Sequence, residues 1–341
     1  MESKLYLKTK RVKIDLTESI DVLTKIFLKL GCSNEVSQEV STHLSDANLC
    51  GMESHGIMRV LQYAEQFQSG YMNPKAKPKV FLDKKGIKRV SGNEGIGIPV
   101  MKIAYMAGVN DAKINGISAL SIRDVGHTGR HGAFADFAAE KGILSICIGG
   151  GNRQTWRQVA PYGGIKALLP TNPWCIGVPG GKLGPVVLDF ATSKIAGGWI
   201  YAAQSANALL PKDCIIDKFG KSTRKPEDYF NGGAILPSGA QKGYGLALIG
   251  ELIGEALLGP STTEANWLLV SIDTSKYRHS SEIYEASEDL LNEIRTSKPA
   301  KGFNKVEIPG ERERLNRKNS NGNIKVPEKT WEQILELHKS L

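Results

Sequence analysis

The sequence predicts a mixed α/β protein in which a central sheet domain is flanked by helices from both ends of the chain. Three features indicate this class. Apolar residues recur with the helical period in the first third, short β-type runs bounded by glycine and proline fill the middle, and the closing "EKTWEQILELHKSL" returns to the helical period. With 341 residues, 41% of them apolar and 23% charged, the chain can bury a substantial core as a soluble globular protein.

Four helices are expected in the first third. Capping residues such as Thr17 and Ser54, together with closing glycines, set their bounds. The helices are predicted at 17–31, 34–51, 54–70 and 99–116. A β-hairpin with a Lys-Lys-Gly turn is expected over 77–95, between the third and fourth helices.

The middle of the chain alternates between strands and helices. Predicted strands lie at 117–123, 143–150, 173–179, 185–191 and 266–273, and further helices at 132–142, 244–259 and 328–341. No internal repeat or low-complexity linker interrupts this order. The pattern predicts a helical domain made of residues 1–75 and 300–341, and an α/β domain made of residues 76–299.

The net charge of +9 is compatible with nucleic acid, with a phosphate-bearing cofactor or with small anionic substrates. Lysine and arginine are mostly interleaved with acids, as in "SEIYEASEDLLNEIRTSKPAK". The densest basic run, "GERERLNRKN", has no interleaved aromatic residues on which bases could stack. We therefore expect a small-molecule partner and no nucleic acid.

The remaining composition predicts a cytoplasmic protein without a membrane partner or a metal site. No apolar run is long enough to cross a bilayer, and the basic N-terminus lacks the apolar core of a secretory signal. The five cysteines are odd in number and form no CxxC pair. We expect them to be buried free thiols rather than disulfides or zinc ligands.

The stretch "ESHGIMRVLQY" is the first candidate functional group. His55, Arg59 and Tyr63 follow one another at four-residue steps, so on one helix capped by Ser54 they would share a face. Histidine exchanges a proton near neutral pH, and arginine can hold a carboxylate with two parallel hydrogen bonds. The group would suit a carboxylic acid with a reactive group beside the acid. A solvent-exposed helix face explains the same pattern.

A second group lies in "SIRDVGHTGRHGAFADFAAEKG". A strand is expected to end near Arg123, and a glycine turn with His127 leads into a helix. Residues at the carboxyl end of a strand often face a ligand crevice in α/β folds, and glycines allow close backbone approach. A plain strand–turn–helix connection with a surface histidine is the alternative.

Two further segments combine polar residues with apolar runs. In "VVLDFATSKIAGG", Asp189 would need a buried partner, for which a histidine is suited, and Thr192 adds a hydroxyl. An ordinary turn with caps is the alternative. In "QKGYGLAL", Lys242 stands at the start of an apolar helix, an arrangement that binds phosphate. Neither a Walker motif nor a Rossmann GxGxxG fingerprint is present, so a dinucleotide would have to bind in another way.

These segments occur in the order found in a known family. "SHGIMRV..Y", "GHTGRHG", "TNP", "LDFATS", "QKGYGLAL" and "IPGERE" resemble the signature segments of the malate/L-lactate dehydrogenase-like oxidoreductases. That family includes ureidoglycolate, sulfolactate and diketogulonate dehydrogenases. The resemblance spans most of the chain, and "PVVLDFATSKIAGG" is most similar to the hydroxycarboxylate dehydrogenase B type.

The resemblance implies a non-Rossmann fold that binds NAD or NADP, uses no metal and works as a homodimer. Members interconvert 2-hydroxy and 2-oxo acids, and one branch instead reduces cyclic imino acids. By matching positions, the catalytic residues would be Ser54, His55, His127 and Asp189, and the substrate-binding residues Arg59 and Tyr63. The residues lining the cofactor would be Asn172, Thr192, Lys242, Gly243 and Glu311.

In the implied reaction, Arg59 anchors the substrate carboxylate while the nicotinamide gives hydride to the 2-carbonyl carbon. His55 supplies the proton as oxyanion character builds, oriented by Ser54 and Asp189. His127 is the rival donor, or a second group that polarises the carbonyl.

Two questions stay open at this level. Trp199 stands where many members have a lysine, which leaves the choice between NAD and NADP open. A reductase of cyclic imino acids and a non-catalytic binding protein are the alternative functions.

Overall fold

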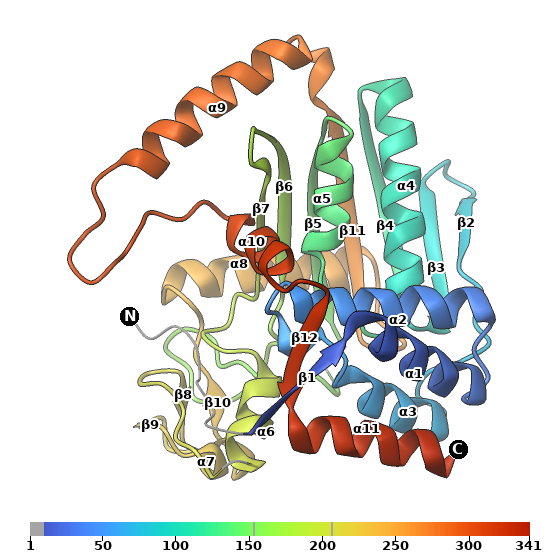
Figure 1. Ribbon diagram of the computed structural model, residues 1–341, viewed down its shortest axis with the longest axis vertical. Coiled ribbons are helices and arrows are strands. Elements are labelled where there is room, and N and C mark those ends of the chain that lie inside the picture. The colour runs from blue at the N-terminus through green and yellow to red at the C-terminus, as the bar shows by residue number, and fades with distance from the viewer. Residues whose placement is uncertain (1–9, 153, 206) are drawn as a thin grey trace.

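The computed structural model describes residues 10–152, 154–205 and 207–341, and its centre is one large mixed sheet (Figure 1). Seven strands form this sheet: β2 (Lys79–Leu82), β3 (Lys88–Gly95), β4 (Ile117–Val125), β5 (Ile143–Gly151), β6 (Trp174–Gly181), β7 (Gly184–Phe190) and β11 (Ala265–Asp273). Their order across the sheet is β2-β3-β4-β11-β5-β6-β7, and only β3 and β4 run parallel. The predicted hairpin and the five predicted strands of the middle region are confirmed.

Helices cover the sheet. α4 (Gly97–Asn115) and α5 (Gly132–Glu140) lie along one of its faces (Figure 1). α8 (Gln241–Glu251) continues into a π-helical turn, η2 (Leu252–Leu257), which packs on β5. A Cβ atom at Gly254 would lie 2.2 Å from the backbone nitrogen of Gly150, so this close approach of the π-helical turn requires glycine.

The two ends of the chain meet in a second, two-stranded sheet. β1 (Arg11–Asp15) pairs antiparallel with β12 (Asn323–Pro327), and the buried Ile14 and Ile324 lie directly opposite each other. The helices from both chain ends are α1 (Leu16–Lys29), α2 (Asn34–Leu49), α3 (Arg59–Gln68), α10 (Glu311–Asn319) and α11 (Glu328–Ser340). Figure 1 shows α1, α2, α3 and α11 beside this two-stranded sheet.

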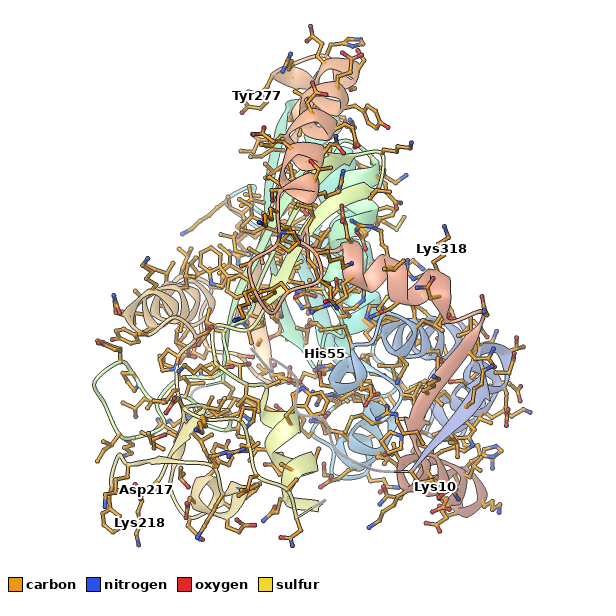
Figure 2. The ribbon with its side chains drawn as sticks, turned by 60° about the vertical axis from the view of Figure 1, so that its left-hand side comes forward. Lys10, His55, Asp217, Lys218, Tyr277 and Lys318 are labelled. Carbon is orange, nitrogen blue, oxygen red and sulfur yellow. The ribbon has the colours of Figure 1, made fainter. Side chains whose placement is uncertain are left out.

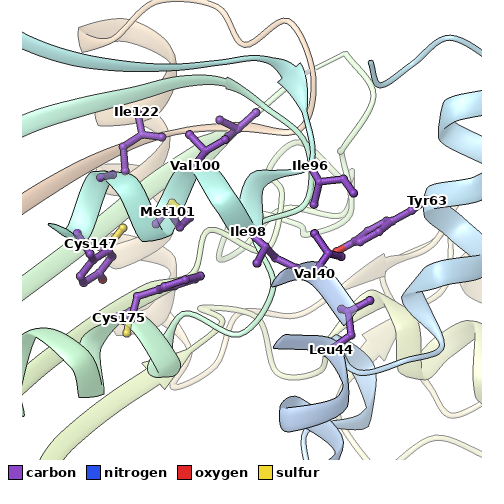
Figure 3. Packing of buried hydrophobic residues seen from close by; sticks show 14 of the residues in the cluster. Val40, Leu44, Tyr63, Ile96, Ile98, Val100, Met101, Ile122, Cys147 and Cys175 are labelled. Carbon is purple, nitrogen blue, oxygen red and sulfur yellow. The ribbon is translucent and has the colours of Figure 1, made fainter. Parts of the chain in front are cut away.

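One apolar core runs from the terminal helices into the sheet. Val40 and Leu44 of α2, Met101 of α4 and Ile122 of β4 belong to the same buried cluster (Figure 3). Tyr63 of α3 is fully buried in it. The terminal helices are therefore packed against the sheet and position α3 beside it.

Residues between β7 and α8 build most of a small lobe that the sequence did not predict. It contains α6 (Gly197–Ser205), α7 (Pro226–Phe230) and a three-stranded sheet of β8 (Ile215–Ile216), β9 (Ser222–Thr223) and β10 (Ala234–Ile235). A separate apolar core fills the lobe, and Trp199 packs against it. The division into two domains that the sequence suggests stays a prediction, and this lobe is a feature that it did not contain.

Two predicted helix starts are wrong for local reasons. Asp15 rather than Thr17 caps α1, because the Asp15 carboxylate accepts the Thr17 N–H at 2.8 Å. Ser54 caps no helix, since it lies in the short 3₁₀ turn η1 (Glu53–His55), and the extended backbone of Gly56 separates that turn from α3.

The segment with interleaved charges forms α9 (Ser280–Thr296), preceded by the 3₁₀ turn η3 (Thr274–Lys276). α9 projects from the outer end of the sheet (Figure 1). The Glu288 carboxylate fixes it to the β6–β7 turn by accepting the Lys182 N–H at 2.7 Å. The charge pattern thus belongs to a helix of which one face packs on the protein and the rest is exposed.

Two expectations from composition can be compared with the fold. All five cysteines are buried and free, as predicted. Across the ranges that the structure describes, no helix is long and apolar enough to cross a membrane.

We predict that Ile324→Ala lowers the free energy of unfolding by about 2–5 kcal/mol, because it leaves a cavity where the two chain ends pair. Lys325→Ala is the matched control, since its side chain is exposed on the opposite face of β12, and we expect a change within about 0.5 kcal/mol. Urea unfolding followed by circular dichroism measures both. Equal effects of the two variants would contradict the stabilising role of the two-stranded sheet formed by β1 and β12.

Candidate active site

The turn after β4 carries the first functional side chain, His127. The Gly126 N–H donates to Gly95 O at 2.9 Å, and the Gly97 N–H donates to His127 O at 3.0 Å, so β3 and α4 fix the turn. A Cβ atom at Gly126 would lie 2.2 Å from the Met72 Sδ atom, so any other residue here would displace the buried Met72 side chain. His127 is only 7% exposed, which rules out the surface histidine considered above.

The Nδ1 atom of His127 lies within hydrogen-bond distance of two groups. The Gly129 nitrogen is 3.3 Å away and the Tyr63 hydroxyl 2.6 Å away. A backbone N–H can only donate, so Nδ1 carries no hydrogen and the Tyr63 hydroxyl must donate as well. The neutral imidazole therefore holds its hydrogen on Nε2. Because Tyr63 belongs to α3, this hydrogen bond also ties the N-terminal helices to the end of β4.

His55 lies beside His127, although the shared helix face expected from sequence does not form. The two rings are 5.4 Å apart and nearly parallel, at 28°. Figure 2 shows His55 near the middle of the molecule. The Ser54 Oγ atom is 3.0 Å from His55 Nδ1. A hydroxyl can donate to a bare nitrogen or accept from a protonated one, so Ser54 is compatible with both protonation states of His55.

Arg59, the first residue of α3, is held in the same site by two of its nitrogens. Its Nε donates to Ser54 O at 2.6 Å, and its Nη1 donates to the Gln62 side chain. The Nη2 atom points toward the small lobe, where a Cβ atom at Gly198 would lie 4.0 Å from it. Within the described residues Nη2 makes no hydrogen bond, which leaves it available for an anion between α3 and α6.

Both histidines are held neutral. Burial lowers the pKa of His55 from 6.5 to about 3, and the positive charge of Arg59 lowers it further. The same two causes, in the same order, hold the pKa of His127 well below its usual range. The second cause changes when a ligand binds, because an anion on Arg59 would cancel the guanidinium charge that opposes protonation.

Within the described structure Asp189 makes no hydrogen bond to a histidine, which differs from the expected pairing. Its Oδ2 atom accepts the Gly132 N–H at 2.7 Å, at the start of α5. Burial raises the pKa of this carboxyl, while the Gly132 hydrogen bond and the nearby Arg130 lower it. Asp189 and the buried Arg130 line a cleft of about 290 Å³, and residues 307–310 line it as well. Asp189 therefore contacts the turn that carries His127 at its far end.

Four of the five expected cofactor residues lie together. The Thr192 Oγ1 atom donates to Asn172 O at 3.1 Å, and a Cβ atom at Gly243 would lie 3.1 Å from Thr192 O. Lys242 is exposed beside Gly243 in the first turn of α8. Asn172 has a left-handed backbone with φ of 35°, and its Oδ1 atom is buried without a partner in the described structure.

Glu311, the fifth expected cofactor residue, is engaged elsewhere. Its carboxylate accepts a hydrogen bond from Arg295 of α9 at 2.7 Å, where α10 begins. Trp199 is partly buried and packs against the apolar core of the small lobe. Neither residue contacts the histidine pair in the described structure.

Sequence reasoning missed Glu264. This residue lies directly before β11, and its Oε2 atom is buried without a partner among the described residues. Burial raises the pKa of Glu264 to about 7, and Arg59 opposes that rise. The only signal in the sequence is one acid directly before an apolar strand, which is also typical of an exposed loop.

Two more histidines lie at this turn, the half-buried His43 of α2 and the buried His131. His43 Nε2 accepts the Arg130 N–H at 3.0 Å, and the Thr128 Oγ1 and His131 Nε2 atoms are 2.6 Å apart. Four of the six histidines of the chain thus gather around residues 126–132. In the part of the chain that the structure describes, no group of three His, Cys, Asp or Glu side chains is arranged to hold a metal ion.

Known proteins share both the sequence and the fold. The sequence model of the family described as malate/L-lactate dehydrogenase matches residues 14–335. L-sulfolactate dehydrogenase of Methanocaldococcus jannaschii is 31% identical over 334 residues, which cover 94% of each protein. A Delta(1)-pyrroline-2-carboxylate/Delta(1)-piperideine-2-carboxylate reductase of Pseudomonas putida is 32% identical over 248 residues, 73% of this chain and 72% of that protein. The solved structure of malate dehydrogenase from Pyrococcus horikoshii superposes with a TM-score of 0.85 at 27% identity, over 99% of this chain and 97% of that chain.

We predict that His55 and His127 remain neutral at pH 5 because both pKa values are lowered, and that His127 carries its hydrogen on Nε2. Histidine-ring ¹⁵N NMR measures both properties. Tyr63→Phe is the matched variant, and it should shift the Nδ1 resonance of His127 without moving the hydrogen, because the Gly129 N–H still donates. A His127 ring with its hydrogen on Nδ1 would contradict this geometry.

Proposed function

The chain belongs to the malate/L-lactate dehydrogenase family, and we propose that it is an NAD(P)-dependent oxidoreductase that interconverts a small 2-hydroxy acid and its 2-oxo acid. The observation that carries the proposal is the grouping of Arg59, with Nη2 available, beside two neutral histidine rings 5.4 Å apart. A 2-oxo acid presents a carboxylate and a neighbouring carbonyl, which match a guanidinium and an imidazole respectively.

Arg59 has the role of binding the substrate carboxylate. Its Nε and Nη1 atoms donate hydrogen bonds to Ser54 O and to the Gln62 side chain, so the guanidinium plane is fixed before a substrate binds. Fixed orientation lowers the entropic cost of binding. The charge of Arg59 also couples binding to protonation, since neutralising it raises the pKa of His55.

The two histidines differ in what their Nδ1 partners allow. Protonation of His127 at Nδ1 would remove the acceptor for the Gly129 N–H, so this ring is suited to stay neutral and to polarise a carbonyl through Nε2–H. A protonated His55 would instead donate from Nδ1 to the Ser54 hydroxyl. We therefore assign proton transfer to His55 and carbonyl polarisation to His127.

Four of the residues that the resemblance assigns to the cofactor, Asn172, Thr192, Lys242 and Gly243, fit a nicotinamide dinucleotide. When bound, the reduced form supplies the hydride that goes to the 2-carbon of the oxo acid. The orphaned Oδ1 atom of Asn172 can accept a hydrogen bond from a carboxamide. Lys242 and the first turn of α8 can bind a phosphate. These features suit NAD and NADP equally, and we propose no choice between them.

The other expected residues have positioning roles in this proposal. Asp189 holds the start of α5 and so the turn that carries His127. Glu311 fixes α10 to α9 through Arg295. Exposed apolar side chains on α8 and the following turn, among them Leu252 at 51% and Leu257 at 68% exposure, support assembly as a homodimer. We also propose that the protein works in the cytoplasm.

A second candidate is reduction of a cyclic imino acid. The Pseudomonas putida relative carries that activity in its name and is 32% identical to this chain. The same Arg59 and His55 would bind the carboxylate and handle the proton, with a C=N bond in place of the carbonyl.

Turnover of 2-oxo acids with NADH and NADPH tests the proposal. We predict that His55→Asn lowers kcat by about 10²–10⁴-fold and removes the limb of the pH profile that reports protonation of the donor. His127→Asn should lower kcat by about 10²–10³-fold but keep that limb, because it removes only a hydrogen-bond donor.

His279→Asn is the control, since this histidine is exposed before α9, and its kinetics should match those of the wild type. A His55→Asn enzyme with near-normal kcat would refute the assignment of the donor. Turnover of cyclic imino acids alone would favour the second candidate.

A further inference from the structure

An ion pair fastens the η1 turn, which carries His55, to the two-stranded sheet of β1 and β12. Glu53 is the first residue of η1, and its carboxylate contacts the Arg11 guanidinium of β1. The same guanidinium donates to Lys325 O of β12 at 3.0 Å. Arg11 therefore connects the η1 turn to both strands of this sheet.

This ion pair is partly shielded from water and has a neighbour with which it can be compared. The side chains of Arg11 and Glu53 are 31% and 26% exposed. Lys10 pairs with Glu328 at the start of α11, and its side chain is 79% exposed. The Lys10 pair holds α11, whereas the Arg11 pair holds η1.

The η1 turn fixes two groups of the proposed reaction at once. The Ser54 Oγ atom lies 3.0 Å from His55 Nδ1, and Ser54 O accepts a hydrogen bond from Arg59 Nε at 2.6 Å. On its other side the turn is held by α2, since Asn48 Oδ1 accepts the Ile57 N–H at 2.8 Å. A shift of the turn would therefore move the proton donor relative to the cation that binds the carboxylate.

The rest of the fold holds these two groups with different firmness. Arg59 belongs to α3, whose Val60 and Tyr63 are buried in the core. His55 lies on the turn, and the extended backbone of Gly56 separates it from α3. Loss of the anchor at the turn should thus displace His55 more than Arg59.

On this basis we propose that Arg11 and Glu53 are positioning residues that hold His55 where it can transfer a proton to a substrate bound at Arg59. The inference rests on the proposed function, because it requires that His55 is the proton donor. Displacement of a reacting group by about 1 Å can lower a rate about a hundredfold, and an ion pair that limits movement of the turn prevents part of that loss. The sheet of β1 and β12 then contributes to the reaction without contacting the substrate.

The test is a double-mutant cycle on kcat. Arg11→Met and Glu53→Met each remove the ion pair, and each should lower kcat about tenfold while KM for the 2-oxo acid changes less than about threefold. Because both act through one pair, the double variant should lose no more kcat than either single variant. Arg11→Lys keeps the charge and should retain most of kcat.

Lys10→Met is the matched control, since it removes the neighbouring ion pair with Glu328, and its kcat should equal that of the wild type. Arg11→Met and Lys10→Met should have similar midpoints of urea unfolding, which separates a loss of positioning from a loss of stability. A near-normal kcat in either single variant, additive losses in the double variant, or a midpoint for Arg11→Met far below that of Lys10→Met would overturn the inference and leave the proposed function in place. Absence of turnover by the wild type with every 2-oxo acid would instead overturn the proposed function, and the inference with it.

Discussion

The hydrogen bond from the Tyr63 hydroxyl to His127 Nδ1 is the interaction on which the arrangement of the site depends. It joins α3, from the N-terminal helices, to the end of β4 in the central sheet. The Gly129 N–H reinforces it and fixes the ring's hydrogen on Nε2. The continuous core beneath Tyr63 and the pairing of β1 with β12 hold the helices where this contact can form.

The positive charge of Arg59 shifts the pKa values of the other titratable groups in the same site. The charge of Arg59 lowers the pKa of both histidines and opposes the raised pKa of Glu264. Partial burial makes these effects stronger than they would be in water. An anion that neutralises Arg59 therefore raises the pKa of these three groups, which links recognition of the carboxylate to readiness for proton transfer.

The strands of the central sheet could be predicted because their apolar runs are bounded by glycine and proline, and the order of motifs was sufficient to indicate the family. The pattern did not show which of several neighbouring residues begins a helix. Gly56 separates His55 from α3, and Asp15 caps α1 in place of Thr17. Contacts between distant segments were equally hidden. The pattern showed that Asp189 needs a partner but not that the Gly132 N–H would satisfy it, and the lone acid Glu264 acquires meaning only beside Arg59.

Coupling between Arg59 and His55 is the central physical claim, and proton uptake on ligand binding tests it most directly. Oxamate resembles a 2-oxo acid but is not reduced, so its binding can be followed by titration calorimetry in buffers of different ionisation enthalpy, with reduced nicotinamide cofactor present. The wild type should take up more protons per bound oxamate than His55→Asn does, and the difference should grow as the pH falls toward the His55 pKa of about 3, since the anion raises that pKa. Equal proton uptake by the two proteins would contradict the coupling.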